Sequence, residues 1–112
     1  MFSIQDILMY IQAGKYRLSE HVKDRMDSRD VTIDEIIEAI KMGRIISEHP
    51  DAEPNPSCLI NGTTFSGRVL QIAIGLEIDG VILITVYDPD RDHMVMLGQK
   101  SKGRRNRNGR KR

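Results

Sequence analysis

Three side chains within residues 18–29 have the types and the spacing for chemistry on a phosphate group. His21, Arg25 and Arg29 follow one another at intervals of four residues, so a helix would place them along one stripe of its surface. An imidazole can exchange a proton near neutral pH, and a guanidinium can bind a phosphate through two parallel hydrogen bonds. The stripe is therefore either a solvated charged face or the working surface of a protein that handles phosphate.

The structural alternative stays open for each of these residues. A histidine in the first turn of a helix can simply bond to a local group or to a nearby aspartate. Arg25 and Arg29 have several acidic neighbours in the sequence, and a helix face of mixed charge is usually just solvated.

Capping signals predict three helices in the first part of the chain. Ser3 begins the first helix, which ends at about Ala13 before a glycine, and Ser19 begins the second, over residues 19–28. Thr32 followed by Glu35 is the pattern of a capping box and begins the third helix, which ends at Gly43. The expected core of that helix consists of Ile33, Ile36, Ile37 and Ile40. Residues 16–18 are expected to be a short connector.

From residue 44 the apolar pattern indicates strands. They are expected over residues 44–47, 57–61, 68–76 and 81–87, with a turn beginning at Asn61-Gly62 and a hairpin turn at Asp79-Gly80. The last two strands are almost continuously apolar, which is typical of the centre of a sheet. The order predicts an α+β domain, with N-terminal helices packed on one face of an antiparallel sheet of about four strands. A short edge strand over residues 93–97 is a further expectation.

The charge is divided unevenly along the chain. Residues 100–112 contain eight Lys or Arg and no acid, which leaves nine basic and sixteen acidic groups, a net charge of −7, in residues 1–99. We expect residues 1–99 to form one domain and residues 100–112 to be a disordered basic tail. Such a tail binds polyanions without sequence preference, so Arg104 and Arg105 are candidate RNA-binding residues. The tail could equally fold against the acidic domain, bind an acidic partner protein or have no specific role.

Several functional classes lack their sequence signals. No segment approaches eighteen apolar residues and no secretion signal is evident, so we expect a cytoplasmic protein with no membrane association. The lone cysteine, Cys58, is expected in the core. The three histidines are too scattered for a metal site, and no cofactor-binding motif is present. We therefore expect neither metal nor cofactor.

The order of several short motifs resembles the bacterial family called domain of unknown function 4258. The resemblance spans about residues 15–90 and is carried by Ser19-x-His21 with Arg25-Met26 and Arg29, Pro56-Ser57-Cys58-Leu59, Gly67-Arg68, and Ile84-Thr85-Val86-Tyr87-x-Pro89. Members are thought to be similar in fold to RelE-type and MqsR-type ribonucleases and often occur beside an antitoxin-like partner. The resemblance implies a RelE-like fold and a toxin-like, metal-independent endoribonuclease of a bacterial toxin–antitoxin pair, with RNA and a cognate antitoxin as partners.

Cleavage of RNA without a metal needs a proton acceptor, a proton donor and cations beside the phosphate. The candidate catalytic residues are His21, Arg25 and Tyr87, and the candidate substrate-binding residues in the domain are Arg29, Arg68, Gln71 and Thr85. Tyr87 could also be a solvated aromatic at the rim of the sheet, while Gln71 and Thr85 could be polar residues satisfied inside it.

One departure from the family favours a different function. Gln71 stands where family members commonly have a histidine in the third strand, and a lost catalytic histidine would leave a non-catalytic RNA- or protein-binding module. An oligomerising or partner-docking domain with no role in nucleic-acid binding is a third hypothesis.

Overall fold

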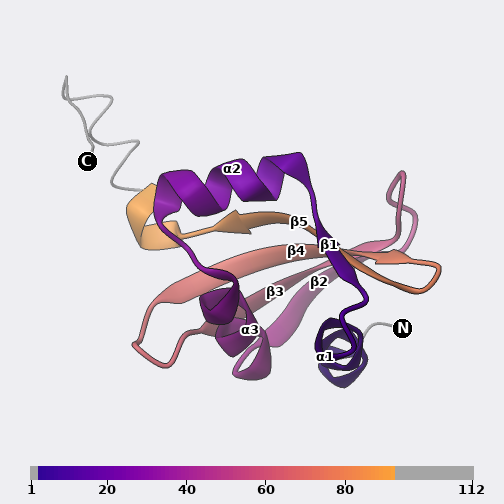
Figure 1. Cartoon of the computed structure of the whole chain (residues 1–112), viewed down its shortest axis with the longest axis horizontal. Helices are drawn as coiled ribbons and strands as arrows, with labels where there is room; N and C mark the ends of the chain where they lie inside the picture. The colour runs from indigo at the N-terminus through magenta and orange to yellow at the C-terminus, as the bar shows by residue number, and fades with distance from the viewer. Residues whose placement is uncertain (1–2, 93–112) are drawn as a thin grey trace.

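The computed structural model describes residues 3–92 and shows an α+β domain (Figure 1). Its elements in chain order are α1 (Ile4–Gln12), β1 (Tyr16–Leu18), α2 (Glu20–Arg29), α3 (Ile33–Lys41), β2 (Arg44–His49), β3 (Ser57–Thr63), β4 (Val69–Glu77) and β5 (Gly80–Tyr87). Residues 89–92 add a helical turn after β5. The expected strand over residues 93–97, the domain boundary at residue 99, and Arg104 and Arg105 lie outside the described residues.

The five strands form one open, mixed sheet in the order β1-β5-β4-β3-β2. Strands β2 to β5 are the predicted antiparallel meander, with β2 and β3 each two residues longer than expected. The expectation of about four antiparallel strands missed β1, which pairs in parallel with β5 through Tyr16 and Val81. A three-residue strand is too short to show a period, and its partner lies at the other end of the domain's sequence.

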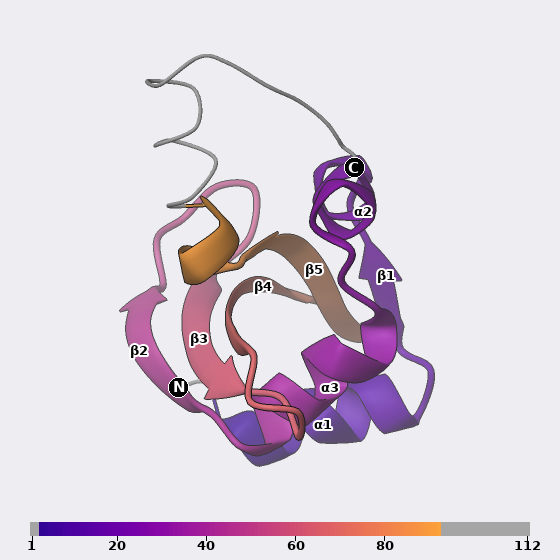
Figure 2. The same ribbon diagram turned by 90° about the vertical axis from the view of Figure 1, so that its left-hand side faces the viewer.

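The three helices surround one hydrophobic core. Helices α1 and α3 lie together beside one face of the curled sheet, whereas α2 runs alongside β5 (Figures 1 and 2). All three contribute buried side chains, and the core residues include Ile7, Ile11, Val22, Ile36, Ala39, Ile40, Cys58, Ile60, Leu70, Ile72, Ile74, Leu83 and Val86. The predicted core positions Ile36, Ile40 and Cys58 are confirmed, while Ile33 and Ile37 are only partly buried against the core.

Each helix begins at the predicted cap. The hydroxyls of Ser3 and Ser19 accept backbone N–H groups at the starts of α1 and α2. Thr32 and Glu35 form the reciprocal capping box at the start of α3. The helices are short, and within residues 3–92 none has the length and apolarity to cross a membrane.

The hairpin loop that was predicted to begin at Asn61-Gly62 and to extend to Gly67 begins later. Asn61 and Gly62 both lie inside β3, and the chain reverses at residues 64–67. A Cβ atom on Gly62 would lie 1.8 Å from the carbonyl oxygen of Ala39 in α3. The glycine is therefore needed for the close approach of α3 to the sheet, rather than for a turn.

Candidate functional site

Helix α2 lies along the part of the β5 edge that β1 leaves uncovered. Strand β1 pairs with β5 as far as Leu83. At the next residue of β5, the carbonyl of Ile84 accepts a hydrogen bond from the hydroxyl of Ser19 at 2.7 Å. One helical turn and a half further on, Nε of Arg25 donates to the carbonyl of Val86 at 3.0 Å. The N-cap residue of α2 and Arg25 within it thus provide hydrogen bonds that a longer β1 would otherwise make, and Arg25 is fixed at the end of β5.

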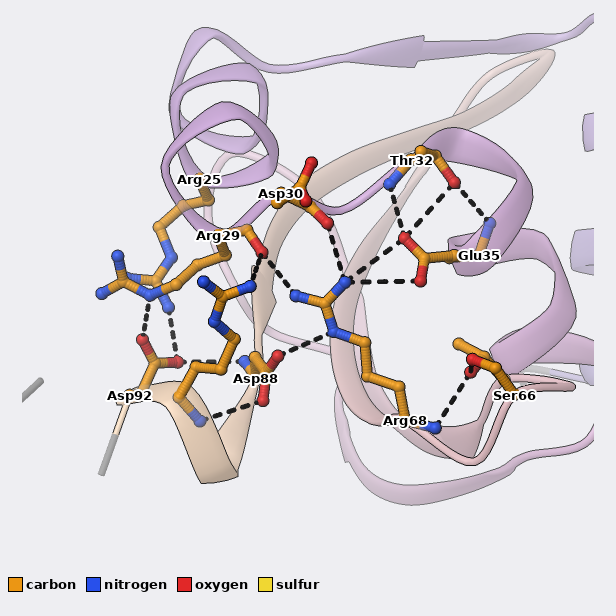
Figure 3. A network of polar contacts seen from close by, with 11 residues as sticks. Arg25, Arg29, Asp30, Thr32, Glu35, Ser66, Arg68, Asp88 and Asp92 are labelled. Atoms are coloured by element: carbon orange, nitrogen blue, oxygen red, sulfur yellow. Dashed lines mark hydrogen bonds and ion pairs between the residues drawn. The ribbon is translucent and has the colours of Figure 1, made fainter. Parts of the chain in front are cut away.

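The two arginines of the predicted stripe converge on one carboxylate (Figure 3). Nη2 of Arg25 lies 2.7 Å from Oδ2 of Asp92, and Nε of Arg29 lies 2.6 Å from Oδ1 of the same residue. The three side chains are only 18–22% exposed. The prediction that Arg25 and Arg29 point the same way from one helix is confirmed, and the anion that they hold within the domain is Asp92.

Asp92 is held in place by the helical turn that follows β5. Oδ1 of Asp88 accepts the backbone N–H of Arg91, while the backbone N–H of Asp88 donates to Oδ2 of Asp92. Pro89 occupies the first position of the turn, where its missing N–H is not needed. The Asp-Pro pair is a helix-start signal that could have predicted this turn from the sequence.

Each of the three guanidinium nitrogens of Arg68 donates a hydrogen bond within the domain (Figure 3). Its Nε lies 2.8 Å from Oδ2 of Asp88, whose side chain is 3% exposed, and its Nη1 lies 3.3 Å from Oε2 of Glu35. The Nη groups also donate to the backbone carbonyls of Arg29 and Asp30. Arg68 thus neutralises a buried carboxylate and connects β4 to the end of α2, a structural role that the sequence did not reveal. Its assignment to phosphate binding stays a prediction.

A polar row crosses the face of the sheet opposite the core. Asn61, Gln71 and Tyr87 are register partners on β3, β4 and β5, and the Gln71 amide donates to Oδ1 of Asn61 at 3.2 Å. The guanidinium carbon of Arg25 lies 5.2 Å from the centroid of the Tyr87 ring, which is a cation–π distance. Tyr87 is 43% exposed. We call these four residues the polar row, and Asn61 is the member that sequence reasoning missed.

Thr85 lies beside the polar row, on the same face of β5 as Tyr87. The residue is 6% exposed, and its hydroxyl has no hydrogen-bond partner among the described residues. Gln71 therefore has one side-chain hydrogen bond within the sheet, to Asn61, whereas Thr85 has none. A buried hydroxyl without a partner costs about 1–3 kcal/mol.

His21 stands at the exposed end of the stripe, in the first turn of α2 and one turn before Arg25. Its predicted role in proton transfer stays a prediction. Within residues 3–92 there is no group of three His, Cys, Asp or Glu side chains that could hold a metal ion.

Comparison with protein families identifies a match over most of the domain. The family model described as Domain of unknown function (DUF4258) matches residues 18–88, the segment from the end of β1 to Asp88. No curated protein and no solved structure matches. The matched segment contains the polar row, Arg29 and Arg68, while Asp92 follows it.

Proposed function

We propose that this chain, which belongs to the family described as Domain of unknown function (DUF4258), binds single-stranded RNA on the open face of its sheet. The observation that supports this most strongly is the polar row, in which two amides, an exposed aromatic ring and a guanidinium are neighbours. Single-stranded RNA is recognised by stacking of its bases on aromatic rings or guanidinium planes and by hydrogen bonds to base edges. Tyr87 and Arg25 supply the first kind of group, and Gln71 and Asn61 supply the second.

Electrostatics assigns a complementary role to residues 100–112. Residues 1–99 carry a net charge of −7, which opposes the approach of RNA. The eight basic residues of the C-terminal segment, Arg104 and Arg105 among them, supply the attraction that is independent of sequence. The polar row then supplies the selectivity for unpaired bases.

Metal-independent cleavage is a second candidate function, and the order His21, Arg25, Tyr87 along one surface favours it. His21 would accept the proton of a ribose 2′-hydroxyl as that oxygen attacks the phosphorus and forms a cyclic phosphate. Tyr87 would protonate the departing 5′-oxygen, while Arg25 would stabilise the charge on the phosphorane. This is the reaction of a toxin-like endoribonuclease of the RelE or MqsR type, for which a cognate antitoxin would be the protein partner.

Binding is tested by fluorescence anisotropy with a short, labelled single-stranded oligoribonucleotide and the full chain. Because base–aromatic stacking contributes about 1–3 kcal/mol per base, Tyr87→Leu should weaken binding roughly tenfold or more. Phe65→Leu is the matched control, since Phe65 is 71% exposed on the turn between β3 and β4. Equal affinity for the Tyr87 and Phe65 variants would refute the proposed surface.

Cleavage is tested with the same RNA, in the presence of a chelator, on a denaturing gel. We expect His21→Ala to abolish cutting without changing the anisotropy, and His49→Ala to cut like the wild type, because His49 lies on β2 and contacts Ser47. A wild-type chain that binds RNA but leaves it intact would restrict the function to binding.

A further inference from the structure

The position of Asp92 is the one in which a phosphate group would meet Arg25 and Arg29. Each carboxylate oxygen accepts from one guanidinium, at 2.7 and 2.6 Å, and these are the short distances of charge-assisted hydrogen bonds. Carboxylates and phosphates present oxygen pairs of similar geometry to arginine. The same two donors therefore fit an oxygen pair of either group.

The charges around the two arginines are balanced only within a wider network. Arg25 and Arg29 carry two positive charges against the single negative charge of Asp92. Asp88, which caps the same turn as Asp92, is paired with Arg68. Two guanidiniums thus share one negative charge at Asp92, while Glu35, the second partner of Arg68, balances the wider network of three arginines and three carboxylates. An RNA phosphodiester, which carries one negative charge as Asp92 does, would keep the same balance at the site.

The side chains of Arg25 and Arg29 do not cap the C-terminal end of α2. The carbonyl of Arg29, at the last position of α2, accepts from the side chains of Arg68 and Arg91 instead. The free carbonyls of a helix end repel anions, and here two other arginines cover them. The side chains of Arg25 and Arg29 are left to hold an oxyanion.

We propose that Arg25 and Arg29 form an oxyanion site for a phosphate group of RNA, and that Asp92 is an internal occupant which the phosphate displaces. The identity of the ligand rests on the proposed function, whereas the oxyanion site rests on the contacts alone. Displacement exchanges one anion for another, so both guanidiniums stay paired. Asp92 is partly exposed already and regains water when it leaves.

The test uses Asp92→Asn, which removes the charge but keeps the shape of the side chain. Asp90→Asn is the matched control, because it makes the same change of charge at an exposed position of the same turn. Inorganic phosphate is titrated into each full-length variant by calorimetry at constant ionic strength. With its internal competitor weakened, the Asp92 variant should bind phosphate about tenfold more tightly than the Asp90 variant and the wild type, a difference of about 1.4 kcal/mol.

The salt dependence of RNA binding gives a second readout. Each phosphate contact to a single strand adds about 0.7 to the slope of log affinity against log salt concentration. Because RNA displaces Asp92 in both variants, Asp92→Asn and Asp90→Asn should have the same slope, with a higher RNA affinity in Asp92→Asn. Arg29→Met, which removes one side of the site, should make the slope shallower by about 0.7. A residue with only a structural role would leave the slope unchanged.

The two proposals fail in different ways. Tighter phosphate binding by Asp92→Asn without any RNA binding would support the oxyanion site and refute the proposed function. Intact RNA binding with equal phosphate affinity and equal RNA affinity in the two variants would refute the role of Asp92.

A measurement on the wild-type chain covers the case in which Asp92→Asn does not fold. The backbone N–H of Asp88 donates to the Asp92 carboxylate at 3.0 Å. Saturating phosphate should therefore speed hydrogen exchange at that amide, but not at the amide of Glu35, which donates to Thr32 in the capping box. Unchanged exchange at Asp88 would overturn the proposal.

Discussion

Replacement of Arg68 with methionine tests whether this residue holds the fold together or binds substrate. Methionine keeps much of the apolar stem of arginine but none of its donors. The buried carboxylate of Asp88 would lose its charged partner at 2.8 Å and keep only the backbone N–H of Arg91. Breaking a buried ion pair in this way costs about 3–5 kcal/mol.

Two smaller losses add to this cost. The pair with Glu35 is longer, at 3.3 Å, and more exposed, so it contributes under about 1 kcal/mol. The backbone carbonyls of Arg29 and Asp30 can turn to water at the surface. We therefore expect Arg68→Met to lower the free energy of unfolding by about 4 kcal/mol, a large part of the 5–15 kcal/mol typical of a domain.

The assay is urea denaturation followed by far-ultraviolet circular dichroism, because the chain has no tryptophan for fluorescence. Arg17→Met is the matched control. The Arg17–Glu77 pair is shorter, at 2.6 Å, but the Arg17 side chain is 62% exposed, so its loss should change stability little.

A small loss of stability for Arg68→Met, under about 1 kcal/mol, would refute the view of Arg68 as the partner that Asp88 needs. A normal stability combined with weakened RNA binding would instead favour the sequence-based prediction that Arg68 contacts phosphate. The free energy of unfolding of Arg68→Lys should lie between those of the wild type and Arg68→Met. Lysine keeps the positive charge, but its ammonium group cannot reproduce the planar set of donors of the guanidinium.

Two further predictions follow from the core. Gly62→Ala would place a methyl group 1.8 Å from the Ala39 carbonyl, so we expect a loss of about 3 kcal/mol or more. In the same denaturation assay Gly67→Ala, which has room but a φ of +97°, should lose only about 1 kcal/mol; a smaller effect at Gly62 than at Gly67 would contradict this. Burial, with a contribution from Glu48, raises the pKa of Cys58 from 9.0 to about 11. The native thiol should react far more slowly with a disulfide reagent than the urea-unfolded chain, and the free energy of unfolding should fall between pH 9 and 11 more steeply than in Cys58→Ala, since the unfolded chain loses the thiol proton first. Equal reaction rates in the native and unfolded states would refute the burial argument.

Local signals predicted the elements that local chemistry determines. The caps at Ser3, Ser19 and Thr32 act over three or four residues, so they could be read directly. β1 was missed because its strand geometry comes from pairing with β5. Gly62 was misinterpreted because a turn dipeptide and a helix contact require the same residue for different reasons.

In the candidate site, too, the local features could be predicted from the sequence and the long-range contacts could not. The helical spacing of His21, Arg25 and Arg29 correctly placed them on α2, but it said nothing of the carboxylate opposite. Asp92 reaches the two arginines only because the helical turn of residues 89–92 folds back against α2. The charge pattern of one helix cannot distinguish a free basic stripe from a paired one, since the answer lies on a different element.

The contacts of Arg25 determine which substitutions are informative. Arg25 binds the carbonyl of Val86, the carboxylate of Asp92 and the ring of Tyr87, so its removal disturbs the β5 edge and the proposed RNA surface together. Tyr87→Leu removes the stacking platform and leaves the edge hydrogen bonds intact. Asp92→Asn changes the occupant of the oxyanion site and leaves both arginines in place. These two substitutions act on the two halves of the surface separately, and their effects on RNA affinity should therefore be opposite in sign.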